Sequence, residues 1–326
     1  MVSSQQAFKS TAMKKIYHLC LSSHDEVLFR SESDLIRGFN ALALASLTTD
    51  SALLADGLLT THLHFLTQTP APKEILYRMR YAHARFFNAK YKRKGKLGEK
   101  YPFCLEIDGF HHTLAALNYV NRQGLHHGLS PTPFGYRHCS ANSIFRKQLG
   151  KSDTGPLLPE GQKHNYLPDG VSLPGQYRMD ASGLLLREDV IDISLVESYY
   201  GTPRNYIFQM NKIGDELSRK EQEKERSDTP IITLELMEHG VPGVNIEQLL
   251  RNESGKHDPK MISDIELCEL IDGTLLRKYC KNVTIYEASI SQRAQLYDMI
   301  QKGLWASRHK LTTDEQLRRC LCLNVK

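Results

Sequence analysis

The stretch SALLADGLLTTHLHFLTQTP, residues 51–70, decides the fold, because an Asp-Gly pair separates two runs of β-prone residues. Asp-Gly is typical of a tight hairpin turn. We therefore expect a strand over residues 53–55, a turn at Asp56-Gly57 and a second strand over residues 58–66. Side chains alternate between the two faces of a strand, so His62 and His64 are neighbours on one face. Leu63 and Phe65 then face the core.

The flanking segments extend this hairpin into an α+β domain. We expect a strand over residues 14–22, a helix capped by Ser33 or Asp34, a helix over 73–92, a strand over 101–107 and a helix from 110 to about 123. The order β-α-β-β-α-β-α is close to the split β-α-β, ferredoxin-like (RRM- or palm-like) arrangement. An antiparallel sheet with helices on one face would leave the other face open for a site.

The amino-acid composition of the chain changes after about residue 130. Residues 130–181 are rich in Pro, Gly and polar residues, which predicts an extended, wrapping or partly mobile segment. The charge run at 218–228 predicts a solvated helix or linker. We divide the chain into a catalytic domain over 1–149, an extended and charged connecting region over 150–229 and a mainly helical C-terminal domain over 230–326.

The last helices of the C-terminal domain have two interpretations. Residues 291–302 have helical character, and Thr312 with Glu315 can form a capping box for a final helix over 314–323 that carries Arg318 and Arg319. The pair could be a DNA-binding helix-turn-helix, although the connection over 303–311 exceeds the usual short turn. A small helical packing domain is the alternative.

Bulk composition places the chain among soluble globular proteins. It has 326 residues, 40% apolar and 24% charged, with a net charge of +5. No run approaches the ~20 apolar residues of a membrane span, and residues 1–14 lack the apolar core of a signal peptide. The seven cysteines form no C-x-x-C pair, which disfavours a zinc ribbon and fits reduced thiols. We expect a cytoplasmic protein.

The candidate site joins the histidine pair to the helix that begins at residue 110. Two neighbouring imidazoles can bind one metal ion. Tyr119 and Gln123 lie four residues apart on that helix and share a face, opposite its apolar stripe. A strand with two nitrogen ligands beside a helix with a nucleophile and an oxygen ligand suits phosphodiester cleavage. Taken alone, the histidines could be surface residues, and Tyr119 could be an amphipathic surface tyrosine or could pack against a later segment. For His112 we expect a surface or DNA-facing position.

A basic stretch with interleaved aromatic residues lies between these two elements. Cations that follow a phosphate backbone, together with rings on which bases stack, describe a surface for single-stranded DNA. The predicted DNA-binding residues are Arg78, Arg80, Arg85, Lys90, Lys92, Arg93, Lys94 and Lys96.

Residues 14–149 resemble the HUH-type single-tyrosine transposases, especially their REP-associated branch. The match runs in order through the strand over 16–21, His62-Leu63-His64, YAHARFFN at 81–88, the Gly- and Lys-rich loop before Tyr101-Pro102-Phe103, and YVNRQ at 119–123 followed by Gly128-Leu129. The chain departs from the family at Leu59-Thr60-Thr61, where an M-P-N-type run usually stands. It also has Gly124 where the family usually has Pro, which should let the helix run on by about a turn.

The resemblance implies a chemistry for each position. His62, His64 and Gln123 would hold a divalent metal, Mg²⁺ or Mn²⁺, although ligand softness alone favours zinc or another transition metal. Tyr119 would attack a phosphodiester of single-stranded or hairpin DNA and form a 5′-phosphotyrosine intermediate. The resemblance also implies a nucleoid-associated homodimer, in which Tyr119 could serve its own chain's histidines or those of the partner.

Two other function classes remain open. A domesticated, non-catalytic protein that binds single-stranded or hairpin DNA fits the departures from the family pattern. A two-histidine phosphoesterase acting on cyclic nucleotides would need a second H-x-[ST] motif on another strand. His111-His112-Thr113 lies at the start of a predicted helix instead.

Overall fold

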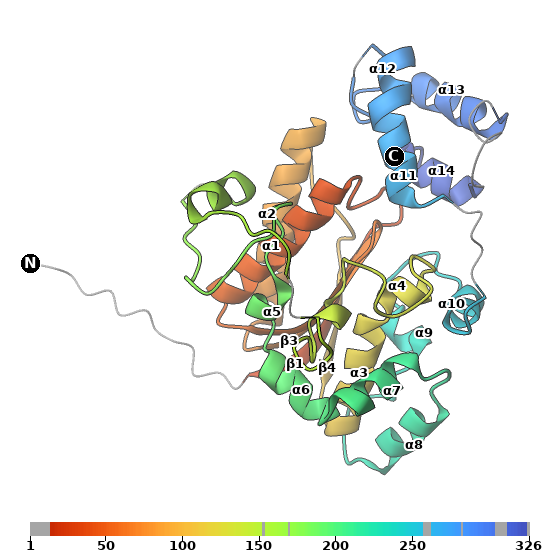
Figure 1. Ribbon diagram of the computed structural model, residues 1–326. Helices are drawn as coiled ribbons and strands as arrows, with labels where there is room; N and C mark the ends of the chain where they lie inside the picture. The colour runs from red at the N-terminus through yellow and green to blue at the C-terminus, as the bar shows by residue number, and fades with distance from the viewer. Residues whose placement is uncertain are drawn as a thin grey trace, which may run out of the picture.

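The computed structural model describes residues 14–151, 154–168, 170–256, 262–281, 283–303 and 312–324. The predicted absence of a signal peptide concerns residues 1–14, of which all but the last lie outside the described residues. Most of the predicted connection over 303–311 also lies outside them. Figure 1 shows a central sheet covered by helices, with the helices of the C-terminal region gathered at one end of the molecule.

The sheet is antiparallel and four-stranded, with the order β2-β3-β1-β4. Its strands are β1 (Lys15–Ser22), β2 (Ala52–Leu58), β3 (His62–Thr69) and β4 (Phe103–Ile107). β1 lies at the centre because it pairs with both β3 and β4, and its Cys20 stands opposite His64. The predicted antiparallel sheet within a mixed α/β chain is confirmed.

The predicted turn at Asp56-Gly57 is wrong, because both residues lie inside β2. The chain turns instead over residues 59–61, where the backbone N–H of Leu59 donates to the carbonyl of His62 at 2.8 Å. A distant partner explains why an acid stands in a buried strand. Arg187 Nε lies 3.0 Å from both carboxylate oxygens of Asp56, and Arg187 Nη2 lies 2.9 Å from Oδ2.

Two long helices cover the face of the sheet opposite the histidines. They are α1 (Glu32–Thr48) and α2 (Pro72–Tyr91), which lie side by side. Gly38 of α1 packs closely against the side chain of Leu58, on the side of the sheet away from His62 and His64. The N-cap of α1 is Ser31, whereas the predicted cap Asp34 lies inside the first turn and accepts from the backbone N–H of Ser31 at 3.0 Å.

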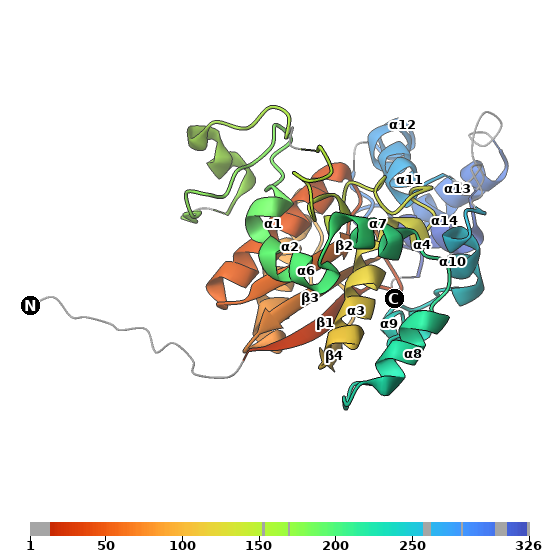
Figure 2. The same ribbon diagram turned by 60° about the horizontal axis from the view of Figure 1, so that its bottom comes forward.

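The other face of the sheet is covered rather than open, which corrects the prediction of helices on one face only. α3 (Phe110–Asn121) crosses this face and packs on β2 and β3 (Figure 2). Burial is complete for Cys20 and His64 beneath it. The helix breaks at Arg122 and continues as the single turn α4 (Gln123–His126), so the predicted extension by about a turn is present with a kink.

Later segments add a third layer over α3. The elements in this stretch are η1 (Ser140–Asn142), η2 (Glu160–Tyr166), α5 (Arg187–Val190), α6 (Ile193–Tyr200), α7 (Pro203–Asn211), α8 (Glu216–Lys224), α9 (Leu234–Met237) and α10 (Ile246–Glu253). α6, α7, α8 and α9 all contact α3. Through α8, the charge run at 218–228 is brought into contact with α3.

The C-terminal helices form a second hydrophobic cluster. The elements are α11 (Asp264–Leu270), the π-helical turn η3 (Ile271–Leu275), α12 (Leu276–Tyr279), α13 (Ile290–Gln301) and α14 (Asp314–Cys320). α14 is capped by the hydroxyl of Thr313 rather than by the predicted Thr312. Arg30, fully buried, joins this cluster to the first domain through two bonds to Asp272, at 2.9 and 2.8 Å. No helix within the described ranges is both long and apolar enough to cross a membrane.

Candidate metal and tyrosine site

The structure brings the four predicted site residues together in the space between the sheet and α3. His62 and His64 point from β3 toward α3, and Tyr119 and Gln123 approach them from above. Exposure is 2% for His62, 0% for His64, 6% for Tyr119 and 0% for Gln123. The alternatives of surface histidines and of a surface tyrosine are therefore wrong, whereas Tyr119 does pack against a later segment, through Glu238.

Each histidine has one ring nitrogen occupied by a hydrogen bond and the other turned into the site. His62 Nδ1 lies 2.9 Å from the hydroxyl of Thr61, which leaves Nε2 free of partners within the described chain. His64 Nδ1 lies 2.9 Å from Nε2 of His18, a buried residue of β1. Metal-binding imidazoles are usually oriented in this way by a hydrogen bond at the second nitrogen.

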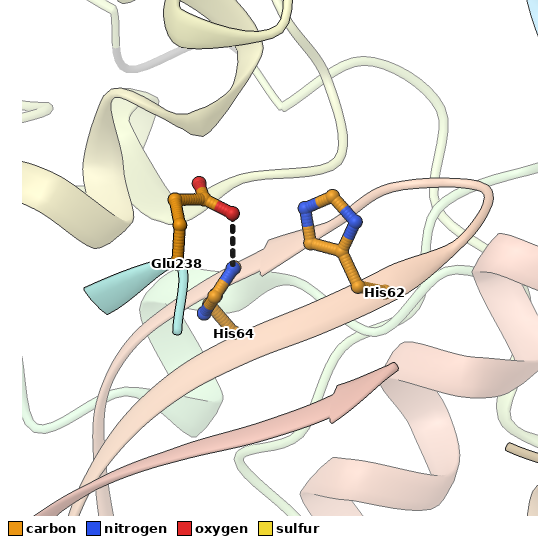
Figure 3. Close-up of side chains that lie close together, drawn as sticks. All are labelled: His62, His64 and Glu238. Atoms are coloured by element: carbon orange, nitrogen blue, oxygen red, sulfur yellow. Dashed lines mark ion pairs between the residues drawn. The ribbon is translucent and has the colours of Figure 1, made fainter. Parts of the chain in front are cut away.

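Glu238, which follows α9, is the residue that the sequence prediction missed. Its carboxylate lies opposite His64 and near His62 (Figure 3). The ligand atoms of these three residues all lie within 4.8 Å of one another. Glu238 Oε2 is 3.8 Å from His64 Nε2 and has no hydrogen-bond partner among the described residues. The only signal in the sequence was an acid within the apolar run LELMEH, residues 234–239.

The other oxygen of Glu238 holds the hydroxyl of Tyr119. Tyr119 Oη donates to Glu238 Oε1 at 2.6 Å and lies 3.2 Å from His64 Nε2. His127 Nε2 lies 3.1 Å from the same oxygen, Oε1. The phenol, the carboxylate and the imidazole therefore form one hydrogen-bonded chain, and every member belongs to the same polypeptide.

Burial and charge fix the protonation state of these groups. Burial lowers the pKa of His62 and of His18 well below the ordinary value, so both are neutral imidazoles, the form that binds metals. Burial alone would raise the pKa of Glu238, but His127 and His64 lower it well below its usual range. Burial, followed by the charge of Glu238, raises the pKa of Tyr119 well above its usual range. Tyr119 is a neutral phenol beside a carboxylate.

Gln123 reaches the site only because strand β2 carries a glycine at that point. A Cβ at Gly57 would lie 2.9 Å from Gln123 Cγ, too close for any other residue without a shift. The carboxamide borders His62 and Tyr119 and makes no hydrogen bond of ordinary geometry within the described chain. A buried amide in this state is unusual. Together with the free atoms of His62 and Glu238, it leaves several unsatisfied donors and acceptors around one point.

These residues fit a divalent cation on two grounds. Two imidazoles and a carboxylate are a common ligand set for transition metals. A bound cation would also satisfy the buried His62 Nε2 and Glu238 Oε2, which otherwise bear a desolvation penalty. The expectation that Gln123 is a ligand remains a prediction.

Two surface pockets approach the site from different sides. One, of about 230 Å³, reaches His62 and His127 and is bordered by His24, Asn245 and Arg319. The other, of about 210 Å³, reaches Tyr119 and is bordered by residues of α8 and α10. Access to the buried atoms therefore begins at two small openings rather than at an open sheet.

His112 does not contribute to this site. It is 1% exposed, which corrects the expected surface position, and its Nδ1 lies 2.9 Å from Glu225 Oε2. His111-His112-Thr113 thus offers no second catalytic histidine beside His62 and His64.

The predicted DNA-binding cations divide into two groups. Several are engaged within the protein: Arg80 bonds the carbonyls of Leu97 and Gly98, Lys90 pairs with Asp34, Lys92 with Glu287 and Arg93 with Glu26. Arg78, Arg85, Lys94 and Lys96 are exposed, with Arg78 in a surface pair with Glu74. Arg78 and Arg85 lie on α2, across the sheet from His62 and His64.

No protein-family model matches the sequence, and no curated protein matches it either. Among solved structures, the chain is similar to a REP-associated tyrosine transposase bound to a REP hairpin, with a TM-score of 0.35 and 8% sequence identity. The match covers 46% of this chain and 87% of that one. A similarity of this size does not assign the chain to that family.

Proposed function

We propose that this chain is a metal-dependent enzyme that nicks and joins DNA, with Tyr119 as the nucleophile. The observation that carries the proposal is the convergence of His62, His64 and Glu238 within 4.8 Å, with the Tyr119 hydroxyl 3.2 Å from His64 Nε2. A nucleophile beside such a metal-type ligand set suits phosphodiester cleavage.

His62, His64 and Glu238 would hold the metal, and Gln123 would complete the set. When bound, the cation would supply charge stabilisation at the scissile phosphate. Tyr119 Oη attacks phosphorus and the bond from phosphorus to the 3′ oxygen breaks, which leaves a 5′-phosphotyrosine and a 3′ oxygen that takes a proton from solvent water to become a 3′-hydroxyl. The tyrosine proton passes to Glu238 Oε1, to which it is already hydrogen-bonded at 2.6 Å. Rejoining reverses these steps without ATP.

The proposal extends to the arrangement of the chain. Tyr119 lies beside its own histidines, which supports action within one chain rather than on a partner's site. The strand order β2-β3-β1-β4 supports a ferredoxin-like classification of the sheet. The domain boundaries at 149 and 229, the homodimer, the cytoplasmic or nucleoid location and the helix-turn-helix remain predictions.

The test is covalent capture of DNA. The full chain is incubated with Mn²⁺ and a library of hairpins that carry single-stranded flanks and a 3′-fluorescein. Because the 5′-phosphate side stays bound to the protein, a 3′ label reports the adduct on a denaturing gel. We expect an adduct with the wild type and with Tyr279→Phe, and none with Tyr119→Phe or in EDTA. An adduct with Tyr119→Phe would exclude Tyr119 as the nucleophile.

A non-catalytic DNA-binding protein is the second candidate, and burial is the observation that favours it. Tyr119 is only 6% exposed, and Glu238 occupies the hydrogen bond that a substrate would have to displace. In that case the wild type would bind the hairpins but form no adduct with Mn²⁺, Mg²⁺ or Zn²⁺. His62→Ala with His64→Ala would then leave binding unchanged.

A further inference from the structure

The outward face of α2 carries a pair of exposed, nearly parallel tyrosines. We propose that this face, defined by Lys73, Tyr77, Arg78, Tyr81 and Arg85, is a second contact surface for single-stranded DNA, separate from the site around Tyr119. The partner class rests on the proposed function, whereas the surface itself is argued from α2 alone.

The two rings form a stacking platform. Tyr77 is 62% exposed and Tyr81 is 53% exposed, although both are large apolar side chains on a well-formed helix. Their ring centroids are 6.0 Å apart and their planes are inclined by 19°. They stand four residues apart and therefore share a helix face. Exposed aromatic rings are sites on which successive bases of a single strand stack, whatever their sequence.

The charges around the rings fit a polyanion. Lys73, Arg78 and Arg85 are exposed on α2, and the Arg85 guanidinium lies 5.8 Å from the Tyr81 ring centroid. Glu74 is the one acid in this helix, and it is paired with Arg78 at 2.7 Å on the surface. Because a surface ion pair contributes little free energy, Arg78 can exchange Glu74 for a phosphate at small cost. Positive charge beside stacking rings favours nucleic acid over an apolar protein face.

The surface lies on the opposite side of the sheet from the proposed site. α2 packs beside α1 on the face away from the histidines, whereas Tyr119 and α3 cover the histidine face (Figure 2). The nucleotide that reaches Tyr119 therefore cannot stack on Tyr77 or Tyr81 at the same time. The α2 surface would hold a different part of the strand, and its contribution should be measurable without cleavage.

The experiment measures binding in EDTA, so that cleavage by Tyr119 plays no part. Fluorescein-labelled dT20 is titrated with the full chain and followed by fluorescence anisotropy. Because the alanine pair removes both rings on which bases would stack, Tyr77→Ala with Tyr81→Ala should weaken binding at least about tenfold. The matched control is Tyr279→Ala on α12, an exposed tyrosine at 40% with Lys278 Nζ 5.2 Å from its ring centroid.

A conservative pair of variants tests stacking itself. Tyr77→Phe with Tyr81→Phe keeps both rings and should bind dT20 as tightly as the wild type. The proposal is overturned if the wild type does not bind dT20, if the alanine pair binds normally, or if the phenylalanine pair fails. It is also overturned if the alanine pair changes the molar mass in light scattering, because the face would then join two copies of the chain. None of these results depends on an adduct at Tyr119.

Discussion

Tyr119 is held as a protonated phenol, and it must lose this proton to act as a nucleophile. Its phenol is neutral, since burial and the Glu238 carboxylate raise its pKa well above the usual range. The same carboxylate is also the nearest acceptor for its proton, at 2.6 Å. A tyrosine in this setting loses its proton only as the new bond forms. Glu238 is therefore the residue whose replacement should be most informative.

The first prediction concerns metal affinity. Removing a group that only orients a ligand costs about 10–100-fold in affinity, and Glu238→Ala removes a ligand, so the loss should be at least that large. Isothermal titration with Mn²⁺ and Zn²⁺ measures it, with His64→Ala as the reference for a lost ligand. Glu235→Ala, an exposed acid on the same short helix, is the control. Unchanged affinity in Glu238→Ala would remove this carboxylate from the site.

The second prediction concerns the buried pair of Asp56 and Arg187. Asp56→Ala leaves the Arg187 guanidinium buried and unpaired, so the free energy of unfolding should fall by about 3–5 kcal/mol. Urea unfolding followed by circular dichroism measures the loss. Asp50→Asn removes an exposed carboxylate, 74% accessible and paired with Lys14, at a position with a left-handed backbone that Asn tolerates, and should change stability by less than about 1 kcal/mol. Equal effects of the two variants would contradict the assigned role of Arg187.

For single residues, the sequence predicted those site positions that follow from strand alternation and helical spacing. His62, His64, Tyr119 and Gln123 converge as expected, because period-two and i,i+4 rules are local. Glu238 was not predicted, because it lies 119 residues beyond Tyr119 in the sequence and no local pattern distinguishes it. The turn at Asp56-Gly57 was predicted wrongly for the same reason, because Arg187, the partner of Asp56, lies 131 residues away.

The position of α3 determines where Tyr119 lies relative to the histidines. An acid distant in sequence binds the N-terminus of this helix. Glu225, just after α8, accepts backbone N–H groups of Phe110 and His111, at 2.7 and 3.0 Å, and the Nδ1 of His112. A carboxylate at a helix N-terminus satisfies free donors and complements the helix dipole. The charge run that contains Glu225 is therefore a structural part of the site rather than only a solvated linker.

The third prediction is a pH-dependent loss of stability in Glu225→Gln. Burial works to raise the pKa of Glu225, but the bonds from His112 and the backbone lower it overall. A lowered folded-state pKa gives stability that is present above the ordinary glutamate pKa and lost as pH falls through the folded value. Urea unfolding should show Glu225→Gln weaker by about 1 kcal/mol at pH 7, with the difference shrinking below about pH 4.3.

A neighbouring acid in the same run is the control. Glu221→Gln removes a carboxylate that pairs with Lys224 at the surface, and should stay near the wild type at both pH values. A gap between wild type and Glu225→Gln that persists unchanged into acid would show that the carboxylate charge is not what anchors α3.

Elements were predicted best where their signal was periodic. The strands around His18 and His64 and the helices on both sides of them lie within a few residues of their expected bounds. The covering of the second face of the sheet was not predicted. The sequence pattern of an antiparallel sheet is compatible with a solvated face or a covered one, so the outcome depends on where later segments of the chain pack.

Across the whole molecule, two hydrophobic clusters are joined by a buried cation. Arg30 bonds Asp272 and also donates to the carbonyl of Cys320 at 2.8 Å. A fully buried guanidinium is tolerated only because these acceptors satisfy it. The C-terminal helices thus depend on a residue that precedes α1, and the mouth of the pocket at His62 includes residues of α14.

The fourth prediction tests this connection with Arg30→Met. Loss of the guanidinium should weaken the docking of residues 262–324 by about 3 kcal/mol, which corresponds to a ~100-fold faster hydrogen exchange in α11–α14. Hydrogen-exchange mass spectrometry compares these helices with β1 and β3 in the same sample. Arg277→Met, an exposed arginine on α12, is the matched control. Unaltered protection in Arg30→Met would show that apolar packing alone holds the two clusters together.

The order of synthesis gives the Tyr119–Glu238 bond a further consequence. A nascent chain that has emerged only through α4 already contains both histidines and Tyr119, yet Glu238 lies 119 residues beyond the tyrosine. Domains fold from the N-terminus as they leave the ribosome, so the sheet can form while the carboxylate is still missing. Under the proposed function, a chain released before residue 238 would carry the nucleophile without its proton acceptor and would be unable to cut DNA.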